Sequence, residues 1–555
     1  MPHENSHGLL RQSGGTILSG SQDNLRTRSE ILLLVAFCGF FFFYGLGAFG
    51  LLGADEPRYA QVAREMLNRS DWITPTLHGE PWLEKPVLYY WQAMLAYKVG
   101  GVSEKTARIP GAVDAALVIT AVYLFLRRFR PGSQFEGALI AASSAGVVGF
   151  ARAAATDMPL ASAFTIALLA WFAWHERGSR LALASCYAFL GLGMLAKGPV
   201  APALAAVIVF LFAAIRRDWG VVWRSLWWPG IAVFLAVSMP WYVAVQLRNP
   251  KFFRTFVLEH NLARFSTNVY HHPQPFWFYL PVFLLAVMPW AMWLIAALAD
   301  YVRRARREGR QWFTTSEAAL PLFLLVWMFV PIIFFSASQS KLPGYVLPAV
   351  PAAALLVAGY LAERNEKPLA IRLPLALAHG LLCGSLVFGS LMAASVAENR
   401  HLLAGKPAFL SGAIAIVFAL CVAAALAARN GSRLLRPLTM LAVVISVAAI
   451  IRLASPAIDA MQSARPIARS IQAFSREPVP VALYHIGRVQ EFGLEFYLDR
   501  PTRKYDEGSV PADAHILVAS RGTESDIRAR LGTRKVSYLT SVPAQKVDVY
   551  WVGKY

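Results

Sequence analysis

Charged residues are scarce in this chain. They make up 15% of its 555 residues, whereas soluble globular proteins carry about 25%. Hydrophobic residues make up 56% of the chain, and the mean hydropathy is +0.46. This balance excludes an ordinary soluble protein, and we expect an α-helical polytopic membrane protein.

Cysteine is also scarce. The four cysteines all lie in apolar stretches, and none has the spacing of a metal ligand; they are Cys38, Cys186, Cys383 and Cys421. We expect them to be packing residues. The segments outside the membrane therefore offer no disulfide bond, although an oxidising compartment would allow one.

Long apolar stretches, in contrast, are abundant. About thirteen of them are long enough to cross a bilayer as helices of roughly 17 to 25 residues. They lie near residues 31–51, 108–126, 134–152, 157–174, 180–196, 199–215, 226–246, 276–300, 317–336, 345–361, 373–397, 408–428 and 437–456. The two Ala-rich stretches between 134 and 174 are the weakest. A count that differs by one would move the carboxyl terminus to the other side of the membrane.

The net charge of +20 comes from arginine and lysine residues. With the amino terminus in the cytoplasm, the short inner loops carry about twice as many of these residues as the short outer connections, as the positive-inside bias requires. An odd number of spans then places the carboxyl terminus outside the cytoplasm. We expect the excess cations to face anionic lipid headgroups, and we expect no nucleic-acid partner.

The chain divides into three parts. Residues 1–29 are polar and are expected to form a disordered cytoplasmic tail, followed by an uncleaved anchor helix. Residues 30–456 are expected to form the membrane domain, and residues 457–555 a small α/β domain outside the membrane that acts as a lid or a docking surface. Its strands are expected at 479–486, 515–520, 535–540 and 546–552, and its helices at 490–498 and 524–531.

Charges do occur directly after the first apolar stretch. Asp55, Glu56 and Arg58 lie there, at a membrane edge where charges are costly and tend to be functional. A helix cap needs only one carboxylate. We therefore expect Asp55 to be functional and Glu56 to cap the helix that follows.

These residues open a long outer segment, residues 53–107, which we expect to be structured. Apolar spacing predicts an interfacial amphipathic helix over 56–68. A second helix, from residue 85, is rich in aromatics and too short to span the bilayer. The connection between them is expected to be extended, so that Asp55 and Glu84 meet at one cavity at headgroup level.

Other outer connections place polar groups at the same level. They include Arg152, Asp157, Lys197, His260, Arg264, Lys341 and Tyr345. Each also has a structural interpretation: Asp157 can cap the following helix, Lys197 can extend to the interface, and a single histidine such as His260 is more often structural. Their convergence from distant parts of the sequence nevertheless favours a site.

Five short motifs at these positions resemble a known family. They are Asp55-Glu56-Pro57-Arg58-Tyr59, Glu84-Lys85-Pro86, Thr156-Asp157-Met158-Pro159, Lys197-Gly198-Pro199 and Ser340-Lys341-Leu342-Pro343-Gly344-Tyr345. Together they closely resemble the 4-amino-4-deoxy-L-arabinose lipid A transferases. These belong with the protein O-mannosyltransferases to the C-type glycosyltransferase superfamily. The acidic pair alone does not separate the subfamilies, whereas the lysine motifs favour the aminoarabinose branch.

This resemblance implies a pentosyltransferase of the bacterial inner membrane with a periplasmic site. It implies transfer of 4-amino-4-deoxy-L-arabinose from undecaprenyl phosphate to a lipid A phosphate, which lowers outer-membrane negative charge and gives resistance to polymyxin. The expected partners are the lipid-linked sugar, lipid A and membrane lipids, and we expect a monomer. One alternative is a polyprenyl-phosphate hexosyl (mannosyl) transferase acting on protein or glycan. Another is a transporter, although transporters place their charges near the midplane.

The chemistry of such a transfer suggests roles for the residues. Loss of a lipid phosphate from the anomeric carbon develops positive charge on the sugar and negative charge on the leaving group. We expect Asp55 and Asp157 to be the catalytic carboxylates. The expected substrate-binding residues are Lys85, Arg58 and Tyr345 at the donor phosphate, together with Glu84, Lys197 and Arg264.

A divalent metal is an alternative way to balance the leaving phosphate. Glu84 with His260 would suit zinc, and Asp55 with Asp157 would suit magnesium. A tight zinc site normally needs three or four ligands, and the nearby lysine and arginine residues can neutralise phosphate themselves. We therefore expect no required cofactor, with zinc or magnesium kept as the alternative.

Overall fold

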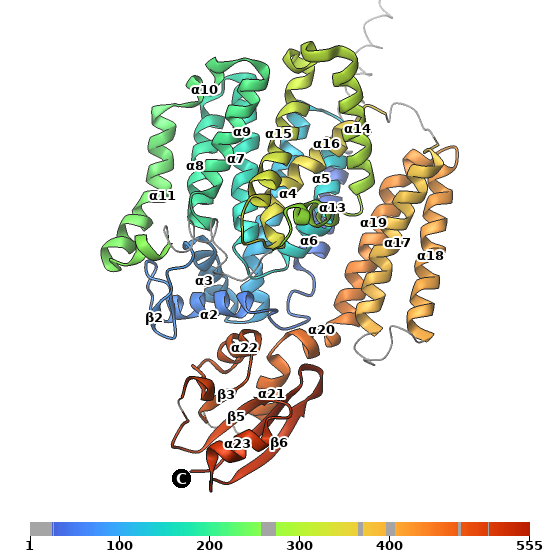
Figure 1. The fold of residues 1–555 in the computed structure, drawn as a ribbon. Helices are drawn as coiled ribbons and strands as arrows, with labels where there is room; N and C mark the ends of the chain where they lie inside the picture. Colours follow the sequence, from blue (N-terminus) through green and yellow to red (C-terminus); the bar gives the residue numbers. More distant parts are fainter. Residues whose placement is uncertain are drawn as a thin grey trace, which may run out of the picture.

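The computed structural model describes residues 25, 27–256, 274–364, 370–395, 406–474, 479–508 and 510–554. Figure 1 shows a bundle of long helices with a small α/β unit beneath one end of it. The first outer segment, residues 53–107, lies between the bundle and this unit.

Nine helical segments of the described chain are long and apolar enough to cross a membrane. They are α4 (Glu104–Phe129), α7 (Asp157–Arg177), α8 (Arg180–Lys197), α11 (Trp228–Arg248), α15 (Ser316–Ser336), η5 with α16 (Pro343–Ala349, Val350–Ala362), α17 (Leu373–Ser395), α18 (Lys406–Ala427) and α19 through α20 (Gly431–Ala449, Ser455–Gln462). A tenth candidate is a pair, α13 (Tyr279–Val287) and α14 (Ala291–Glu308), bent by 113°. The predicted class, an α-helical polytopic membrane protein, is confirmed.

The expected count of thirteen spans stays a prediction. Residues 27–43 are helical and end in the π-helical turn η1 (Gly39–Phe43), and α9 (Val200–Arg216) is apolar but short. The Ala-rich stretch at 134–152 forms two helices, α5 (Gln134–Ser143) and α6 (Ala145–Ala151). They separate at Ser144, whose backbone is extended because the Ala145 N–H donates to the carbonyl of Met288 at 2.9 Å.

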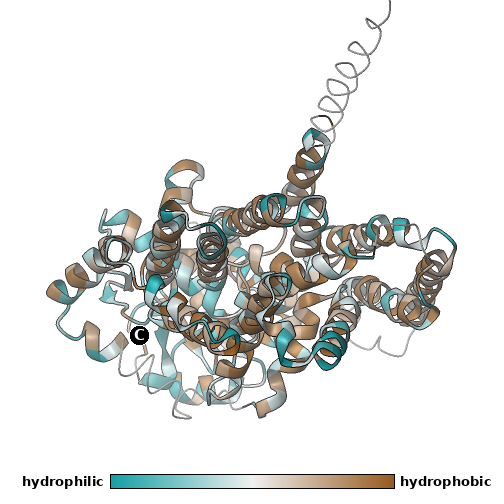
Figure 2. Ribbon diagram, turned by 90° about the horizontal axis from the view of Figure 1, so that it is seen from above, coloured by the Kyte–Doolittle hydropathy of each residue, from teal (hydrophilic) through white to brown (hydrophobic). Residues whose placement is uncertain are grey.

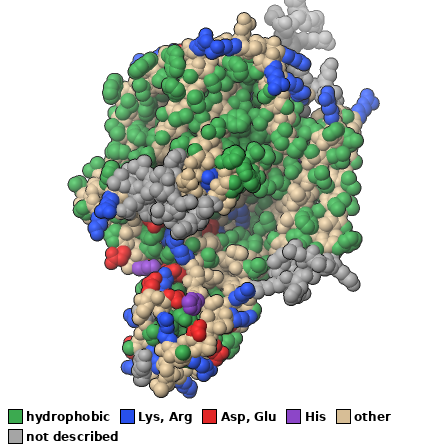
Figure 3. Space-filling view, in the orientation of Figure 1, with side chains coloured by type: hydrophobic (Ala, Val, Ile, Leu, Met, Phe, Trp, Pro, Cys, Tyr) green, Lys and Arg blue, Asp and Glu red, His purple; other side chains and the backbone are tan. Residues whose placement is uncertain are grey.

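Hydrophobic side chains cover the outside of the helical part as well as its interior. Figure 3 shows them over the flank of the bundle, and Figure 2 shows apolar helices throughout its cross-section. In α11 and α18, only 22% and 28% of the most apolar 18-residue stretch is buried inside the protein. Helices that are apolar on their exposed faces require lipid around them.

The cysteines are free thiols. Cys186 and Cys383 are buried and Cys38 is partly buried, as expected of packing residues. For Cys421 that expectation is wrong, because this residue is exposed on α18.

The first outer segment lies across one end of the bundle (Figure 1). α2 (Asp55–Asn68) and α3 (Leu88–Gly100) share one hydrophobic core, and the hairpin of β1 (Thr76–Leu77) and β2 (Glu80–Pro81) joins them. Both expected helices are confirmed. α3 begins three residues later than predicted, after Pro86, since the residue before a proline disfavours helical backbone.

The α/β unit contains a five-stranded sheet in the order β4-β3-β5-β7-β6. Its strands are β3 (Val481–Tyr484), β4 (Arg503–Lys504), β5 (His515–Ser520), β6 (Val536–Val542) and β7 (Val547–Val552). β3 pairs in parallel with β4 and β5, whereas β7 is antiparallel to β5 and β6. The helices α21 (Arg465–Phe474) and α22 (Arg488–Leu498) contribute to the core on one face, and α23 (Glu524–Leu531) to that on the other. The four predicted strands and two predicted helices are confirmed, and the two-residue β4 was not predicted.

Polar contacts attach this unit to the loop that follows η1. Asp459 accepts a hydrogen bond from the Gly50 N–H at 2.9 Å, and the Tyr497 hydroxyl accepts one from the Leu51 N–H at 2.8 Å. A Cβ on Gly50 would lie 2.1 Å from the Ser463 hydroxyl oxygen. Glycine is therefore required where these two parts of the chain meet.

Candidate active site

Asp55 and Arg58 form an ion pair in the first turn of α2. Residues three apart lie on one face of a helix, and here an Arg58 guanidinium nitrogen lies 2.5 Å from the Asp55 carboxylate. The Asp55 side chain is 54% exposed, whereas that of Arg58 is only 7% exposed. The pair thus presents a carboxylate to its surroundings while its cation is held inside the protein.

Three aromatic rings enclose the Arg58 guanidinium. Its central carbon lies 5.3 Å from the ring centre of Tyr59, 4.9 Å from that of Trp82 and 5.4 Å from that of Phe492. Within the described chain, the buried Nε of Arg58 has no hydrogen-bond partner. The guanidinium therefore has a fixed position and an unused donor, as an anion-binding group requires.

Glu56 anchors the first turn of α2 to neighbouring segments. Its carboxylate accepts hydrogen bonds from Arg108 at 2.7 Å, from the Leu52 N–H at 2.8 Å and from the Ala154 N–H at 2.9 Å. Ala54 precedes α2 and makes no side-chain cap. The prediction that Glu56 caps α2 is therefore wrong, because its carboxylate is used to join the loop to α4 and to the segment before α7.

A second cluster forms where α7, α8 and η5 meet. The Lys197 ammonium lies 2.6 Å from an Asp157 carboxylate oxygen and 4.7 Å from the ring centre of Tyr345. Both charged side chains are largely buried, so the alternative in which Lys197 extends to the interface is wrong. Asp157 is the first residue of α7, and its contact with Lys197 gives it a role beyond a helix cap.

Gly344 explains the close fit of this cluster. A Cβ at this position would lie 2.5 Å from Asp157 Oδ1 and 2.9 Å from the Phe150 ring. Real Cβ atoms do not make contacts that short, so any other residue would push Asp157 away from Lys197. The glycine in the Lys-Leu-Pro-Gly-Tyr motif thus has a local physical reason.

Tyr59, next to Arg58 in α2, is a buried phenol on which charges of both clusters act. Its pKa is raised first by complete burial and then by the negative charge of Asp55, with Arg58 opposing and Asp157 and Glu84 adding to the increase. Three carboxylates from two separate parts of the chain therefore act on one buried phenol. The predicted meeting of Asp55, Glu84 and Asp157 at one cavity stays a prediction, and Tyr59 itself was not predicted as a site residue.

The remaining predicted residues fall into three groups. Glu84 and Lys85 are half-buried after the β1–β2 hairpin, and the charge of Glu84 also acts on Arg58. His260 and Arg264 lie outside the described residues. Two other groups expected at this level, Arg152 and Lys341, bind backbone carbonyls instead; their acceptors are Phe41 and Gly45 for Arg152 and Ser338 for Lys341.

The metal alternative stays a prediction. Within the described chain, no group of three or more His, Cys, Asp or Glu side chains is arranged to hold a metal ion. Asp55 and Asp157, the magnesium candidates, are each paired with a cation. The zinc pair of Glu84 and His260 extends beyond the described residues and stays a prediction.

The α/β unit contributes a residue to the site that sequence reasoning missed. Phe492 of α22 covers Arg58, and on the same helix Glu495 pairs with His78 of the β1–β2 turn. Only the amphipathic spacing of α22 was visible in the sequence. That spacing shows which face is buried but does not show which distant loop it contacts.

The arrangement suits transfer chemistry at a membrane edge. A half-exposed carboxylate lies beside an enclosed guanidinium, and a second carboxylate lies beside an ammonium and a phenol. Such a set can stabilise positive charge on one fragment of a reacting molecule and negative charge on the other.

Comparisons with known proteins point to one family. The family model of dolichyl-phosphate-mannose-protein mannosyltransferases matches residues 84–243. An undecaprenyl phosphate-alpha-4-amino-4-deoxy-L-arabinose arabinosyl transferase from Pseudomonas savastanoi pv. phaseolicola is 30% identical over 422 residues, 75% of this chain and 75% of the relative. Relatives of that name from Pseudomonas fluorescens and Pseudomonas aeruginosa are 32% and 34% identical over 63% and 61% of this chain. The chain spans 59% and 60% of the length of these two relatives in the matched regions.

Solved structures agree on the fold. The crystal structure of ArnT from Cupriavidus metallidurans bound to undecaprenyl phosphate superposes with a TM-score of 0.74, at 22% identity, over 94% of this chain and 97% of that one. The apo form of the same protein gives a TM-score of 0.73, at 21% identity, over 95% and 98% of the two chains. The sequence match to the Pseudomonas savastanoi relative and the shared fold confirm the resemblance drawn from the motifs: the chain belongs to the family of undecaprenyl phosphate-alpha-4-amino-4-deoxy-L-arabinose arabinosyl transferases.

Proposed function

We propose that this protein is a glycosyltransferase that moves 4-amino-4-deoxy-L-arabinose from undecaprenyl phosphate to a phosphate of lipid A. Family membership supports the donor, which the relatives' names specify. The observation that carries the site is the half-exposed Asp55 carboxylate beside the enclosed Arg58, with Asp157 and Glu84 acting on the same buried Tyr59. These groups lie at the end of the membrane helices, where two membrane-anchored substrates can meet (Figure 1).

In the proposed reaction the bond between the anomeric carbon and the undecaprenyl phosphate oxygen breaks. The leaving phosphate keeps the electron pair, and a lipid A phosphate oxygen forms the new bond to the same carbon. Arg58, Lys85 and Tyr345 bind the donor phosphate and stabilise its developing charge, with Lys197 and Arg264 contributing further positive charge. The carboxylate of Asp55 faces the sugar and stabilises the positive charge on the ring.

The acceptor determines how much proton transfer Asp55 must do. A phosphomonoester has a second pKa of about 6, so a lipid A phosphate is largely ionised at neutral pH. No proton has to be removed from such a nucleophile. Asp55 then acts by position and charge rather than as a general base, and Asp157 or Glu84 pairs with the ammonium group of the sugar.

The proposed location is the bacterial inner membrane, with the site and the α/β unit on the periplasmic side and the protein as a monomer. The arginine-rich short loops support this orientation. Both substrates are expected there as lipids, and capping of a lipid A phosphate by an amino sugar reduces its negative charge. Cells that contain the active protein are therefore expected to resist polymyxin.

A direct assay tests the proposal. Purified full-length protein is incubated with undecaprenyl phosphate-linked aminoarabinose and lipid A, and the lipid A is examined by mass spectrometry. We expect lipid A to gain one aminoarabinose with the wild type and with Glu80→Gln, an exposed carboxylate on β2. Asp55→Asn is expected to abolish the gain. Equal product from Asp55→Asn and the wild type would contradict the assigned site.

A second candidate function rests on the mannosyltransferase family model, which matches residues 84–243. A hexosyltransferase acting on a serine hydroxyl needs a general base, because a hydroxyl must lose its proton. The same assay with polyprenyl-phosphate mannose and a peptide separates the two candidates. Transfer of a neutral hexose to the peptide, with none to lipid A, would favour this alternative.

A further inference from the structure

A large cavity lies at the other end of the bundle. It has a volume of about 820 Å³ and opens between α14, α16 and the first turns of α17 and α19. These helix ends are at the top of Figure 1, whereas α2 and the α/β unit are at the bottom. The cavity is therefore separate from the candidate active site, and the transfer reaction does not account for it.

The charge of this cavity is strongly positive. Among the described residues, five arginines and two carboxylates line it, which gives them a formal charge of +3; they are Arg303, Arg304, Arg307, Arg364, Arg372, Asp300 and Glu363. Such a density of guanidinium groups in one concave site requires anions to balance it. Arginine is also the residue best shaped to bind phosphate oxygens in pairs.

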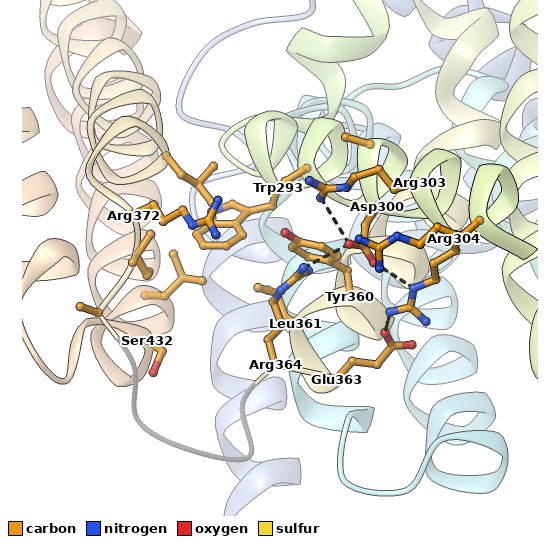
Figure 4. Close-up of a pocket in the computed structure, with 17 residues that line it drawn as sticks. Trp293, Asp300, Arg303, Arg304, Tyr360, Leu361, Glu363, Arg364, Arg372 and Ser432 are labelled. Atoms are coloured by element: carbon orange, nitrogen blue, oxygen red, sulfur yellow. Dashed lines mark hydrogen bonds and ion pairs between the residues drawn. The ribbon is translucent and has the colours of Figure 1, made fainter.

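Asp300 fixes one side of this cluster. Its carboxylate binds Arg303 at 3.3 Å, Arg304 at 3.0 Å and Arg364 at 3.2 Å, as Figure 4 shows. Glu363 pairs with Arg304 as well. Two carboxylates shared by three arginines leave one positive charge of this group uncompensated.

Two further arginines have no acidic partner within the described chain. They are Arg307 on α14 and Arg372 at the start of α17, and both line the cavity. In Figure 4, Arg372 lies beside Trp293 and across the cavity from Arg304. An anion placed between Arg372 and Arg304 would contact guanidinium groups from the start of α17 and from α14.

Most of the other described residues of the wall are apolar, with Tyr360 and Ser432 as the exceptions. Trp293, Leu361, Ile371, Leu375 and Leu435 line the cavity together with the arginines, and Trp293 is almost fully buried. Water-soluble anions gain nothing from such a wall, whereas an acyl chain does. Arginines beside apolar side chains at the end of membrane-spanning helices match the two ends of a phospholipid.

We propose that this cavity binds the headgroup of an anionic phospholipid. The phosphodiester lies among Arg307, Arg372 and the Asp300-linked arginines, and the acyl chains follow the apolar wall into the bilayer. Binding is independent of the transfer reaction, because none of these residues belongs to the candidate active site. A bound headgroup would bridge α14 and α17, because arginines of α14 and at the start of α17 line the cavity.

Lipid titration of the full-length protein in neutral detergent, followed by native mass spectrometry, tests the proposal. The probe is phosphatidylglycerol, with phosphatidylcholine as the neutral comparison. We expect Arg307→Gln/Arg372→Gln to weaken phosphatidylglycerol binding at least fivefold. The wild type is expected to bind phosphatidylcholine at least fivefold more weakly than phosphatidylglycerol.

Arg306→Gln/Arg310→Gln is the matched control. It removes the same charge from exposed neighbouring residues that do not line the cavity, so binding should stay within twofold of the wild type. Arg307→Lys/Arg372→Lys checks folding, because it retains the charge and should retain most of the binding. Equal weakening by both glutamine pairs would overturn the proposal. Displacement of the lipid by an equal concentration of inorganic phosphate would also overturn it, since that result identifies a free-anion site.

Discussion

His78 and Glu495 connect the first outer segment to the α/β unit. The Nε2 of His78, in the turn between β1 and β2, lies 2.9 Å from a carboxylate oxygen of Glu495 on α22. Glu495 is almost fully buried, and Phe492, one helical turn earlier, covers Arg58. The ion pair thus sits next to the contact through which the α/β unit reaches the candidate active site.

The attachment of the α/β unit is expected to weaken as pH rises. The close contact with the Glu495 carboxylate raises the pKa of His78 above its usual 6.5, while burial opposes this increase. A pKa raised by folding means that the stabilisation is fully present below the unfolded value and is lost as pH rises through the folded value. Hydrogen exchange of the α22 amides, measured from pH 6 to pH 9 and corrected for intrinsic exchange, should show this loss of protection. His78→Gln should remove that part of the pH dependence, and an identical profile in the variant would rule out this pair as the cause.

Asp55→Asn is expected to lower kcat by about a hundredfold or more, since losing one preorganised charge at a reacting centre typically costs 10²–10³ in rate. The amide keeps the shape of the side chain but cannot stabilise positive charge on the sugar. Steady-state kinetics with varied donor will separate the effects on kcat and KM. Glu80→Gln serves as the control, and retention of normal turnover by Asp55→Asn would show that its charge is dispensable.

Glu56→Gln is expected to lower the stability of the folded protein. Arg108 is fully buried and donates to Glu56 and to three backbone carbonyls. Removing one partner of a buried ion pair typically costs about 3–5 kcal/mol. Thermal unfolding in detergent should show a lower Tm for Glu56→Gln than for Glu80→Gln. Matching unfolding curves would mean that the pair does not hold the loop.

Gly344→Ala is expected to reduce kcat/KM about tenfold, because its Cβ would displace Asp157 from Lys197. The nearby Gly149 on α6 is a matched control, since a Cβ there meets no atom within 4 Å. Gly149→Ala should therefore keep normal activity. Equal kinetics for the two variants would show that the Asp157–Lys197 pair tolerates displacement.

The composition and periodicity of the sequence predicted most of the elements. The apolar stretches gave the membrane helices, and alternation in the carboxyl-terminal part gave strands that match β5 and β7 within one residue. Such elements are determined by which faces must avoid water, and that information is local. The Ala-rich stretch at 134–152 failed as one span because a tertiary hydrogen bond from Ala145 to Met288 supports a break that composition does not reveal.

The candidate site was predicted in part. The sequence identified Asp55, Arg58, Asp157, Lys197 and Tyr345, because charges and motifs at membrane edges stand out against an apolar background. It assigned the functional role to Asp55 and a capping role to Glu56, and the capping role is wrong. The structure separates them: Asp55 stays half-exposed beside Arg58, and Glu56 is used by Arg108.

The sequence by itself determined that this is a membrane protein, at which ends of its membrane helices charged residues lie, and which family it resembles. Only the tertiary structure decided which charges pair and that Phe492 covers Arg58. The physical reason is that burial patterns follow from local hydrophobicity, whereas ion pairs and ring contacts depend on distances between segments far apart in the chain. Those distances are set only when the helices and the α/β unit pack together.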